Sequence, residues 1–104
     1  MYLKNNQFLN NMNIFSNFNK SNFSKILVNL NSNINSLDDY LDFENKWLNC
    51  YNENKQFYFI FDTTKVGMIN PIYSYYLINF IKKLKNLNNN HLLNFSIIIV
   101  DNWY

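Results

Sequence analysis

The stretch FYFIFDTTKVGMINPIYSYYLINFIKKLK, residues 57–85, decides the fold of this chain. Its first five residues, 57–61, are all apolar or aromatic, and the run stops at Asp62. A short apolar run without alternation is typical of a strand whose two faces are both covered by helices. After a polar turn, Asn70 and Pro71 suit the cap and the first position of a helix. The stretch therefore predicts a buried strand and a long helix, as in a parallel or mixed α/β sheet.

Another helix and another strand flank this stretch. Ser36, followed three residues later by Asp39, is a capping pattern that predicts a helix over residues 37–51. Residues 95–100 predict a last strand, which also ends at an aspartate, Asp101. The expected apolar faces of the two helices are Leu37, Tyr40, Leu41, Trp47, Leu48 and Tyr51 in the first, and Tyr73, Leu77, Phe80, Ile81, Leu84 and Leu87 in the second.

The N-terminal part of the chain predicts a β-hairpin. Residues 13–18 alternate between apolar and polar side chains, residues 19–22 are turn formers, and residues 23–30 alternate into an apolar run. Residues 1–12 are polar and rich in Asn, so we expect them to be frayed. A single domain over residues 13–104 is predicted.

The predicted elements follow in the order β, β, α, β, α, β. Right-handed crossovers within one sheet would place residues 26–30 in the centre, between the strand at 57–61 and the strand at 95–100. The N-terminal arm would pair antiparallel at an edge. The predicted fold is a small, mixed, mostly parallel β-sheet with amphipathic helices.

The composition limits the core and suggests a source. With 104 residues the chain supports one small core, built from bulky side chains because it has 10 Phe, 8 Tyr and 2 Trp but no Ala. Asparagine makes up nearly a quarter of the residues, and every basic residue is Lys. A+T-rich codons specify Asn, Lys, Ile, Phe and Tyr, which suggests the genome of a large DNA virus, a protist or an organelle.

The charge argues against a nucleic-acid partner. A net charge of +2 spread along the chain is too small for a basic binding face. Lys82, Lys83 and Lys85 cluster late in the predicted helix, where cations complement the helix dipole. We interpret them as a solvated face rather than as a contact for anionic lipid or phosphate.

Cys50, the single cysteine, cannot form an internal disulfide, nor a structural zinc site with the lone His91. We interpret it as a buried thiol, because no adjacent His, Lys or Arg would lower its pKa. The N-terminus lacks the apolar core of a signal peptide, and no apolar run approaches the roughly 20 residues that span a bilayer. We therefore expect no transmembrane segment and an intracellular, cytoplasmic protein, in an infected host cell if the chain is viral.

Polar side chains gather at the carboxyl edge of the predicted sheet, where α/β folds bind ligands. Asp62 and Asp101 invite a metal or phosphoryl-transfer hypothesis, but strands on either side of a central one start roughly 10 Å apart. An Asp after a strand is also a common turn former. Because no Gly-rich phosphate loop and no Arg accompany the two carboxylates, we favour the turn and expect no catalytic residue, metal or cofactor. The candidate binding rim is Asp62, Thr63, Thr64, Asn70, Asp101 and Asn102.

The segment FDTTKVGMINPIYSYYLINFIKKLK, followed by FSIIIVDN, resembles the STAS domain of anti-sigma-factor antagonists and sulfate-transporter tails. In that family a strand ending in Asp-x-Ser/Thr leads through a short apolar turn to Asp-Ser-Ser-Gly, which opens a helix. Here residues 61–64 match the strand end, but residues 70–73, Asn-Pro-Ile-Tyr, replace the phosphorylatable Ser and the Gly. The resemblance thus implies a regulatory interaction domain without the phosphorylation switch. The family continues with a further helix and strand, so this chain resembles a C-terminally truncated version with apolar sheet surface left uncovered.

A second resemblance is to the lipid-binding lobe of CRAL-TRIO domains, carried by the strand, the long helix and residues 97–103. It implies a hydrophobic ligand, although enclosing a lipid needs a cavity of several hundred cubic ångströms. The run of residues 61–85 is also similar to uncharacterised proteins of large DNA viruses.

We therefore predict a non-catalytic protein-interaction or regulatory module of STAS type, with a protein partner or self-association. The alternatives are a carrier of lipid or another hydrophobic ligand, and an Asp-dependent phosphoryl-transfer or metal enzyme. We interpret Trp103 and Tyr104 as packing residues rather than as a recognition tip.

Overall fold

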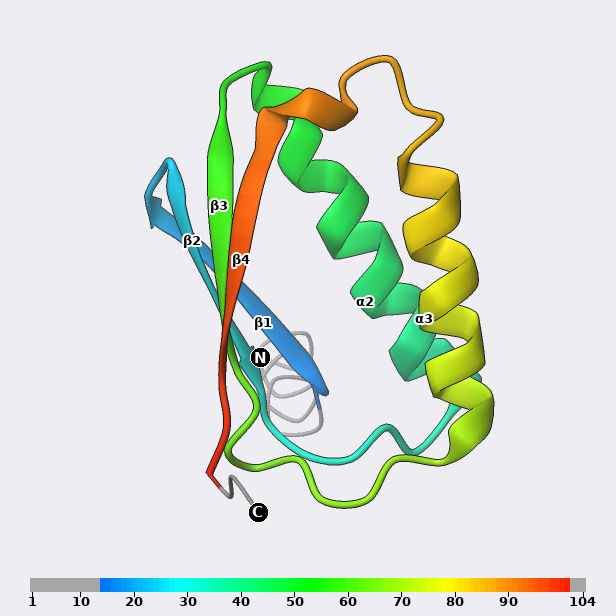
Figure 1. The fold of residues 1–104 in the computed structure, drawn as a ribbon. Helices are drawn as coiled ribbons and strands as arrows, with labels where there is room; N and C mark the ends of the chain where they lie inside the picture. Colours follow the sequence, from blue (N-terminus) through cyan, green and yellow to red (C-terminus); the bar gives the residue numbers. More distant parts are fainter. Residues whose placement is uncertain (1–13, 102–104) are drawn as a thin grey trace, which may run out of the picture.

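The computed structural model describes residues 14–101; the predicted frayed segment 1–12, Asn102, Trp103 and Tyr104 lie outside the described residues. One four-stranded sheet and two α-helices make up the fold, in the predicted order and with the predicted mixed, mostly parallel sheet (Figure 1). The elements are β1 (Ser16–Asn22), β2 (Lys25–Leu30), α2 (Leu37–Asn49), the 3₁₀ turn η1 (Cys50–Glu53), β3 (Phe57–Asp62), α3 (Pro71–Leu84), η2 (Asn90–Leu92) and β4 (Leu93–Ile99).

The first two strands form the predicted antiparallel hairpin, but its turn is displaced. Residues 19–22, predicted as the turn, belong to the end of β1, and the chain reverses at Phe23 and Ser24. The Asn-rich residues still affect the geometry, because the pairing register shifts between Asn19 and Asn22. The N-terminal arm is an edge strand, as predicted.

The predicted strand order is wrong. The sheet runs β1-β2-β3-β4, so β3 lies beside β2 as predicted, but β1 takes the other side of β2 and β4 pairs with the outer edge of β3. The hairpin explains the difference: β1 occupies the second edge of β2, so β4 cannot pair with β2 and pairs with β3 instead.

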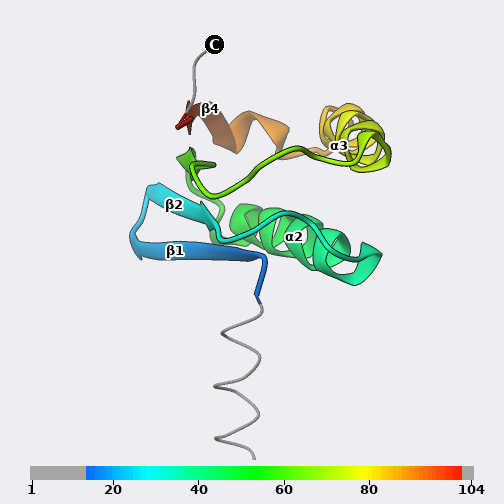
Figure 2. The same ribbon diagram turned by 90° about the horizontal axis from the view of Figure 1, so that it is seen from below.

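This strand order also corrects the prediction that helices cover both faces of β3. Successive crossovers of the same hand that advance in one direction across a sheet place their helices on one face. Helices α2 and α3 accordingly lie on the same side of the sheet, and the opposite side has no helix among residues 14–101 (Figures 1 and 2). The exposure pattern of β3 agrees, because buried and half-buried side chains alternate along it.

The core between the sheet and the helices is largely aromatic. Phe57 and Phe59 on β3 are completely buried, and the Trp47 ring of α2 meets Phe59 edge-on at 4.9 Å and Phe80 of α3 edge-on at 5.4 Å. Edge-to-face pairs of this kind add about 0.5–1.5 kcal/mol each beyond the burial of their area. The Trp47 ring therefore joins the sheet to both helices.

The buried stripe of α2 differs from the predicted one. Tyr40, Phe43 and Trp47 are buried, which is a regular spacing of three and four, whereas the prediction omitted Phe43. The predicted face residues Leu37, Leu41 and Leu48 are exposed by 49%, 44% and 39%. In α3, Phe80 and Leu84 are buried as predicted, whereas Ile81 is exposed.

Both predicted helix starts are confirmed. The Ser36 hydroxyl accepts a hydrogen bond from the Asp39 backbone N–H at 3.2 Å, and the Asn70 side chain accepts one from the Ile72 N–H at 3.0 Å. Each satisfies an amide that the helix itself leaves unpaired. Pro71 takes the first helical position, where its missing N–H costs nothing.

Candidate functional site

The predicted binding rim is built mainly as a turn at the end of β3. Asp62 Oδ1 accepts hydrogen bonds from the backbone N–H of Thr64 at 3.0 Å and from its hydroxyl at 2.7 Å. These two bonds, the side-chain one first, hold the pKa of Asp62 below its ordinary value. The carboxylate thus acts as a local turn former, which is the interpretation that the sequence favoured.

The other residues of the rim fix neighbouring elements. The Thr63 backbone N–H and hydroxyl both donate to the Ile99 carbonyl, at 2.9 and 2.7 Å, and so attach the loop to the end of β4. Asn70 caps α3, and the Tyr73 N–H is already bonded to the Asn70 carbonyl at 3.0 Å. Two amides of the first helical turn are therefore occupied, which weakens the case for an anion at this helix start.

The two aspartates stand on neighbouring strands, not on strands separated by a third. Asp62 pairs with Ile99, and Asp101 follows two residues later, exposed to solvent. The expected separation of roughly 10 Å, taken across a central strand, therefore does not apply. Within residues 14–101, however, no group of three His, Cys, Asp or Glu side chains is placed to hold a metal ion.

The open face of the sheet is the most distinctive surface of the molecule. Strand pairing aligns its side chains in three rows across β2, β3 and β4. Lys25 and Tyr58 form the first row, extended by the Phe95 ring, which stacks on Tyr58 at 4.7 Å and 17°. The middle row is Leu27, Ile60 and Ile97, and the last row is Asn29, Asp62 and Ile99.

The apolar side chains of the open face are partly or largely exposed. Phe95, Ile97 and Ile99 are exposed by 50%, 47% and 45%. Tyr58 and Ile60 are half-buried between their neighbours. On β1 the same face carries Asn17 and Asn19, so the apolar surface has a polar border. Neighbouring exposed apolar side chains of this kind make the open face a candidate interaction site.

Strand β4 is also the outer edge of the sheet. From Leu93 to Ile99 it carries no charged side chain, and Ile98 on its helix-facing side is 62% exposed. Natural edge strands are usually protected by charges, prolines or bulges. The β4 edge has no charged residue and no proline. Its side chains therefore extend the apolar surface of the open face to the edge of the sheet.

The cavities are small or open. The most apolar one, about 80 Å³, lies between α2, α3 and the loop before α3, and Tyr40, Leu77 and Ile69 are among its lining residues. Pockets that enclose small ligands measure about 300–1,000 Å³, so this cavity does not favour the lipid-carrier alternative.

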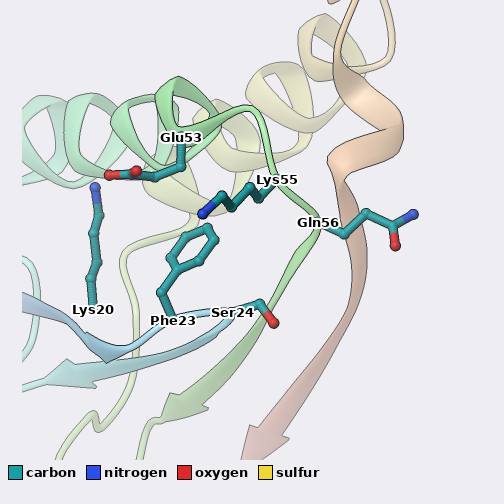
Figure 3. A pocket seen from close by; sticks show the side chains of 6 residues that line it. All are labelled: Lys20, Phe23, Ser24, Glu53, Lys55 and Gln56. Carbon is teal, nitrogen blue, oxygen red and sulfur yellow. The ribbon is translucent and has the colours of Figure 1, made fainter.

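A hollow of about 320 Å³ lies at the other end of the strands, between the hairpin and the segment that leads into β3 (Figure 3). Lys20 and Glu53 point toward one another across it, and Gln56 points away. Its polar side chains are accessible to solvent and include both positive and negative charges. The hollow therefore does not favour a ligand of either charge.

Cys50 and Tyr40 are two of the titratable groups that are buried in the core. Burial raises the pKa of the Cys50 thiol to about 11, although Lys20 opposes the shift, and Cys50 Sγ donates to the Lys46 carbonyl at 3.3 Å. This confirms the interpretation of Cys50 as a buried thiol. Burial, and then the neighbouring Glu44 carboxylate, raises the pKa of Tyr40, whose hydroxyl has no partner within hydrogen-bonding geometry. Neither group is activated for catalysis at neutral pH.

The sequence predicted the rim residues as the candidate site and also predicted uncovered apolar sheet surface, but it did not assign individual residues to that surface. The signal was present, because Tyr58 and Ile60 are apolar although they alternate with the buried Phe57, Phe59 and Phe61. It was interpreted as evidence for helices on both faces. Lys82, Lys83 and Lys85 are all exposed, as the solvated-face interpretation expects.

No protein-family model matches this chain, and no curated protein and no solved structure matches it either. Among the helices of residues 14–101, none combines the length and the apolar character needed to cross a bilayer.

Proposed function

We propose that this chain is a non-catalytic protein-interaction module that docks a protein partner through the open face of its sheet. One observation carries the proposal: β3 is apolar on both faces, whereas the described fold covers only one of them. A strand with this composition is normally buried on both sides. A partner protein would supply the missing layer.

The shape and chemistry of the open face suit a protein surface better than a small molecule. The face is a broad sheet surface with apolar side chains in the middle and asparagines at the β1 border. Protein interfaces commonly have an apolar, aromatic centre within a polar rim. The stacked Tyr58 and Phe95 rings are of the residue type that anchors such interfaces.

The rim takes a supporting role in this proposal. Asp62, Thr63 and Thr64 order the loop beside the open face, and the Asp62 side chain forms part of that face. We also propose that the module is of STAS type and intracellular, without the phosphorylation switch, since Asn70 caps α3 where the STAS family has its phosphorylatable motif. The phosphoryl-transfer alternative has less support, because no third acidic or histidine side chain joins the two aspartates within residues 14–101.

Site-specific photo-cross-linking tests the proposal. A photoreactive benzoylphenylalanine replaces Ile97 on the open face, or Ile72 on α3, in the full chain expressed in the cells that naturally produce it. The two positions are a matched pair, since Ile97 is 47% and Ile72 is 44% exposed. We expect discrete protein adducts on a denaturing gel from position 97 and none from position 72. Equal adduct patterns from the two positions, or no protein adduct from position 97, would contradict the proposal.

A further inference from the structure

We propose that the partner on the open face is a second copy of this chain, stacked face to face with its strands antiparallel. The inference rests on the proposed function and specifies the partner. Its starting point is the order of the three rows: the basic row with Lys25 lies at one end, the apolar row with Ile60 in the middle, and the acidic row with Asp62 at the other end.

A two-fold axis along the middle row makes this face complementary to itself. The rotation places Leu27, Ile60 and Ile97 of one copy on the same row of the other, so apolar side chains meet apolar side chains. It also exchanges the two end rows. Lys25 of each copy then faces the row of the other copy that contains Asp62, which gives two opposite-charge pairs in one dimer.

The distances allow these pairs. Stacked sheets pack about 10 Å apart and neighbouring strands lie about 4.8 Å apart, a separation that an extended lysine and an aspartate side chain span together. The local bonds of Asp62 both use Oδ1, so Oδ2 is left for a partner. Lys25 is half-buried, and its side-chain ammonium has no hydrogen-bond or ion-pair partner among residues 14–101.

The charge pattern favours this arrangement over its alternatives. An axis parallel to the strands would stack basic row on basic row and acidic row on acidic row. Pairing of two β4 edges would leave Lys25 and Asp62 far from any opposite charge of the second copy, and it would leave the open face uncovered. The antiparallel stack both covers the apolar face and pairs its charges.

The size of the face limits the surface that two copies can bury. Four strands at about 4.8 Å and six residues at about 3.3 Å give a face of roughly 20 by 20 Å. This area lies below the roughly 800 Å² per partner of a standard interface, so we expect a reversible dimer.

Charge exchange between the two end rows tests the arrangement on the full chain, by sedimentation equilibrium. Lys25→Asp places two carboxylates against each other, and Asp62→Lys places two ammonium groups against each other. We expect each variant to weaken the dimer by about tenfold or more. An equimolar mixture of the two variants should form a heterodimer, and the double variant K25D/D62K should recover the homodimer. The control Lys82→Asp makes the same charge change on the exposed surface of α3 and should leave the dissociation constant unchanged.

The salt dependence needs no variant and decides the matter if Asp62→Lys fails to fold. Added sodium chloride should weaken the wild-type dimer, since two ion pairs contribute to it. A monomeric wild-type chain at millimolar concentration would overturn the inference. So would a dimer insensitive to salt and to Lys25→Asp, which would indicate β4 edge pairing. A wild-type chain that dimerises only after deletion of residues 1–13 would show that this segment, and not a second copy, covers the face.

The two proposals can fail separately. Cross-links from position 97 to a different protein, with a monomeric purified chain, would support the interaction module and overturn the dimer. Absence of cross-links from position 97 would contradict both.

Discussion

The covered and open faces of the sheet both carry large apolar side chains, but the two faces differ in environment. On β3 the covered face presents Phe57, Phe59 and Phe61, of which the first two are completely buried. The open face of the same strand presents Tyr58 and Ile60, which neighbouring side chains bury only in part. Apolar composition alone therefore does not determine coverage; the path of the chain across the sheet does.

The two faces also differ in what their side chains can contribute. Burying a large apolar side chain stabilises the fold by about 1.5–3 kcal/mol, and the covered face gains this contribution within one chain. The side chains of the open face gain it in full only when a partner excludes water. The covered face is thus expected to determine folding, and the open face to determine association.

The largest expected effect comes from truncating one large side chain on the covered face. Phe59→Ala leaves a cavity among Trp47, Phe18 and Phe61 and should lower the free energy of unfolding by about 3–5 kcal/mol. Ile60→Ala, at the next residue, should lower it by about 1 kcal/mol in the monomer, because Ile60 is only partly buried. Urea denaturation of dilute protein measures both values.

The comparison of Phe59→Ala with Ile60→Ala also tests whether the open face is uncovered in the monomer. If Ile60→Ala lowered the free energy of unfolding as much as Phe59→Ala does, another part of the same chain would cover Ile60 in the monomer. The proposed docking surface would then not be available.

A smaller effect is expected from introducing a hydroxyl on each face of β2. Val28→Thr keeps the shape of a completely buried side chain but gives it a hydroxyl among apolar neighbours, which should cost about 1–3 kcal/mol. Leu27→Thr places the hydroxyl on the open face, where water can reach it, and should change the free energy of unfolding by about 1 kcal/mol or less.

The same two variants should rank in the opposite order when dimerisation, rather than stability, is measured. Leu27 lies in the middle row of the open face, so Leu27→Thr should weaken the proposed dimer, whereas folded Val28→Thr should dimerise like the wild type. Analytical ultracentrifugation compares them. An equal loss of association in both variants would show that the two faces do not have separate roles.

Local patterns in the sequence predicted the elements of this fold well. The caps at Ser36 and Asn70 depend on residues two or three positions away, and each bond forms as predicted. The apolar run at 57–61 likewise predicted a strand, because strand formation follows from neighbouring side chains. The buried state of Cys50 could be predicted from its apolar surroundings in the same way.

The order of the strands could not be predicted from these patterns. It depends on which edge is free when β4 forms, and the hairpin had already occupied one edge of β2. Because β1 pairs with β2, β4 lies beside β3 and both helices lie on one face of the sheet. The open face of the sheet and the position of Asp62 beside β4 both follow from this strand order.

The rim was predicted as a set of residues, but its internal bonds depend on distances along the fold. The Asp62 turn is a short-range feature and was correctly interpreted, since its partner Thr64 is two residues away. The bond from Thr63 to Ile99 joins residues far apart in the sequence and could not be predicted without the strand order.

The smallest expected effect concerns the ionisation of Asp62 on the open face. Thr64→Val removes the hydroxyl bond to Oδ1 but keeps the backbone bond, so the pKa of Asp62 should rise toward its ordinary value. A carboxyl whose pKa is lower in the folded protein stabilises the fold above its unfolded-state pKa, and this contribution is lost as the pH falls through the folded-state pKa. The difference in stability between the wild type and Thr64→Val should therefore be present at neutral pH and shrink in acid, and it should be small because the carboxylate is solvated.

Carboxyl carbon NMR titration measures the pKa of Asp62 directly. An unchanged pKa in Thr64→Val would show that the turn does not depend on the threonine hydroxyl. In that case the Thr64 N–H alone would account for the low pKa of Asp62. Thr64→Val would then leave the charge of Asp62 unchanged, and the proposed dimer should form in this variant as in the wild type.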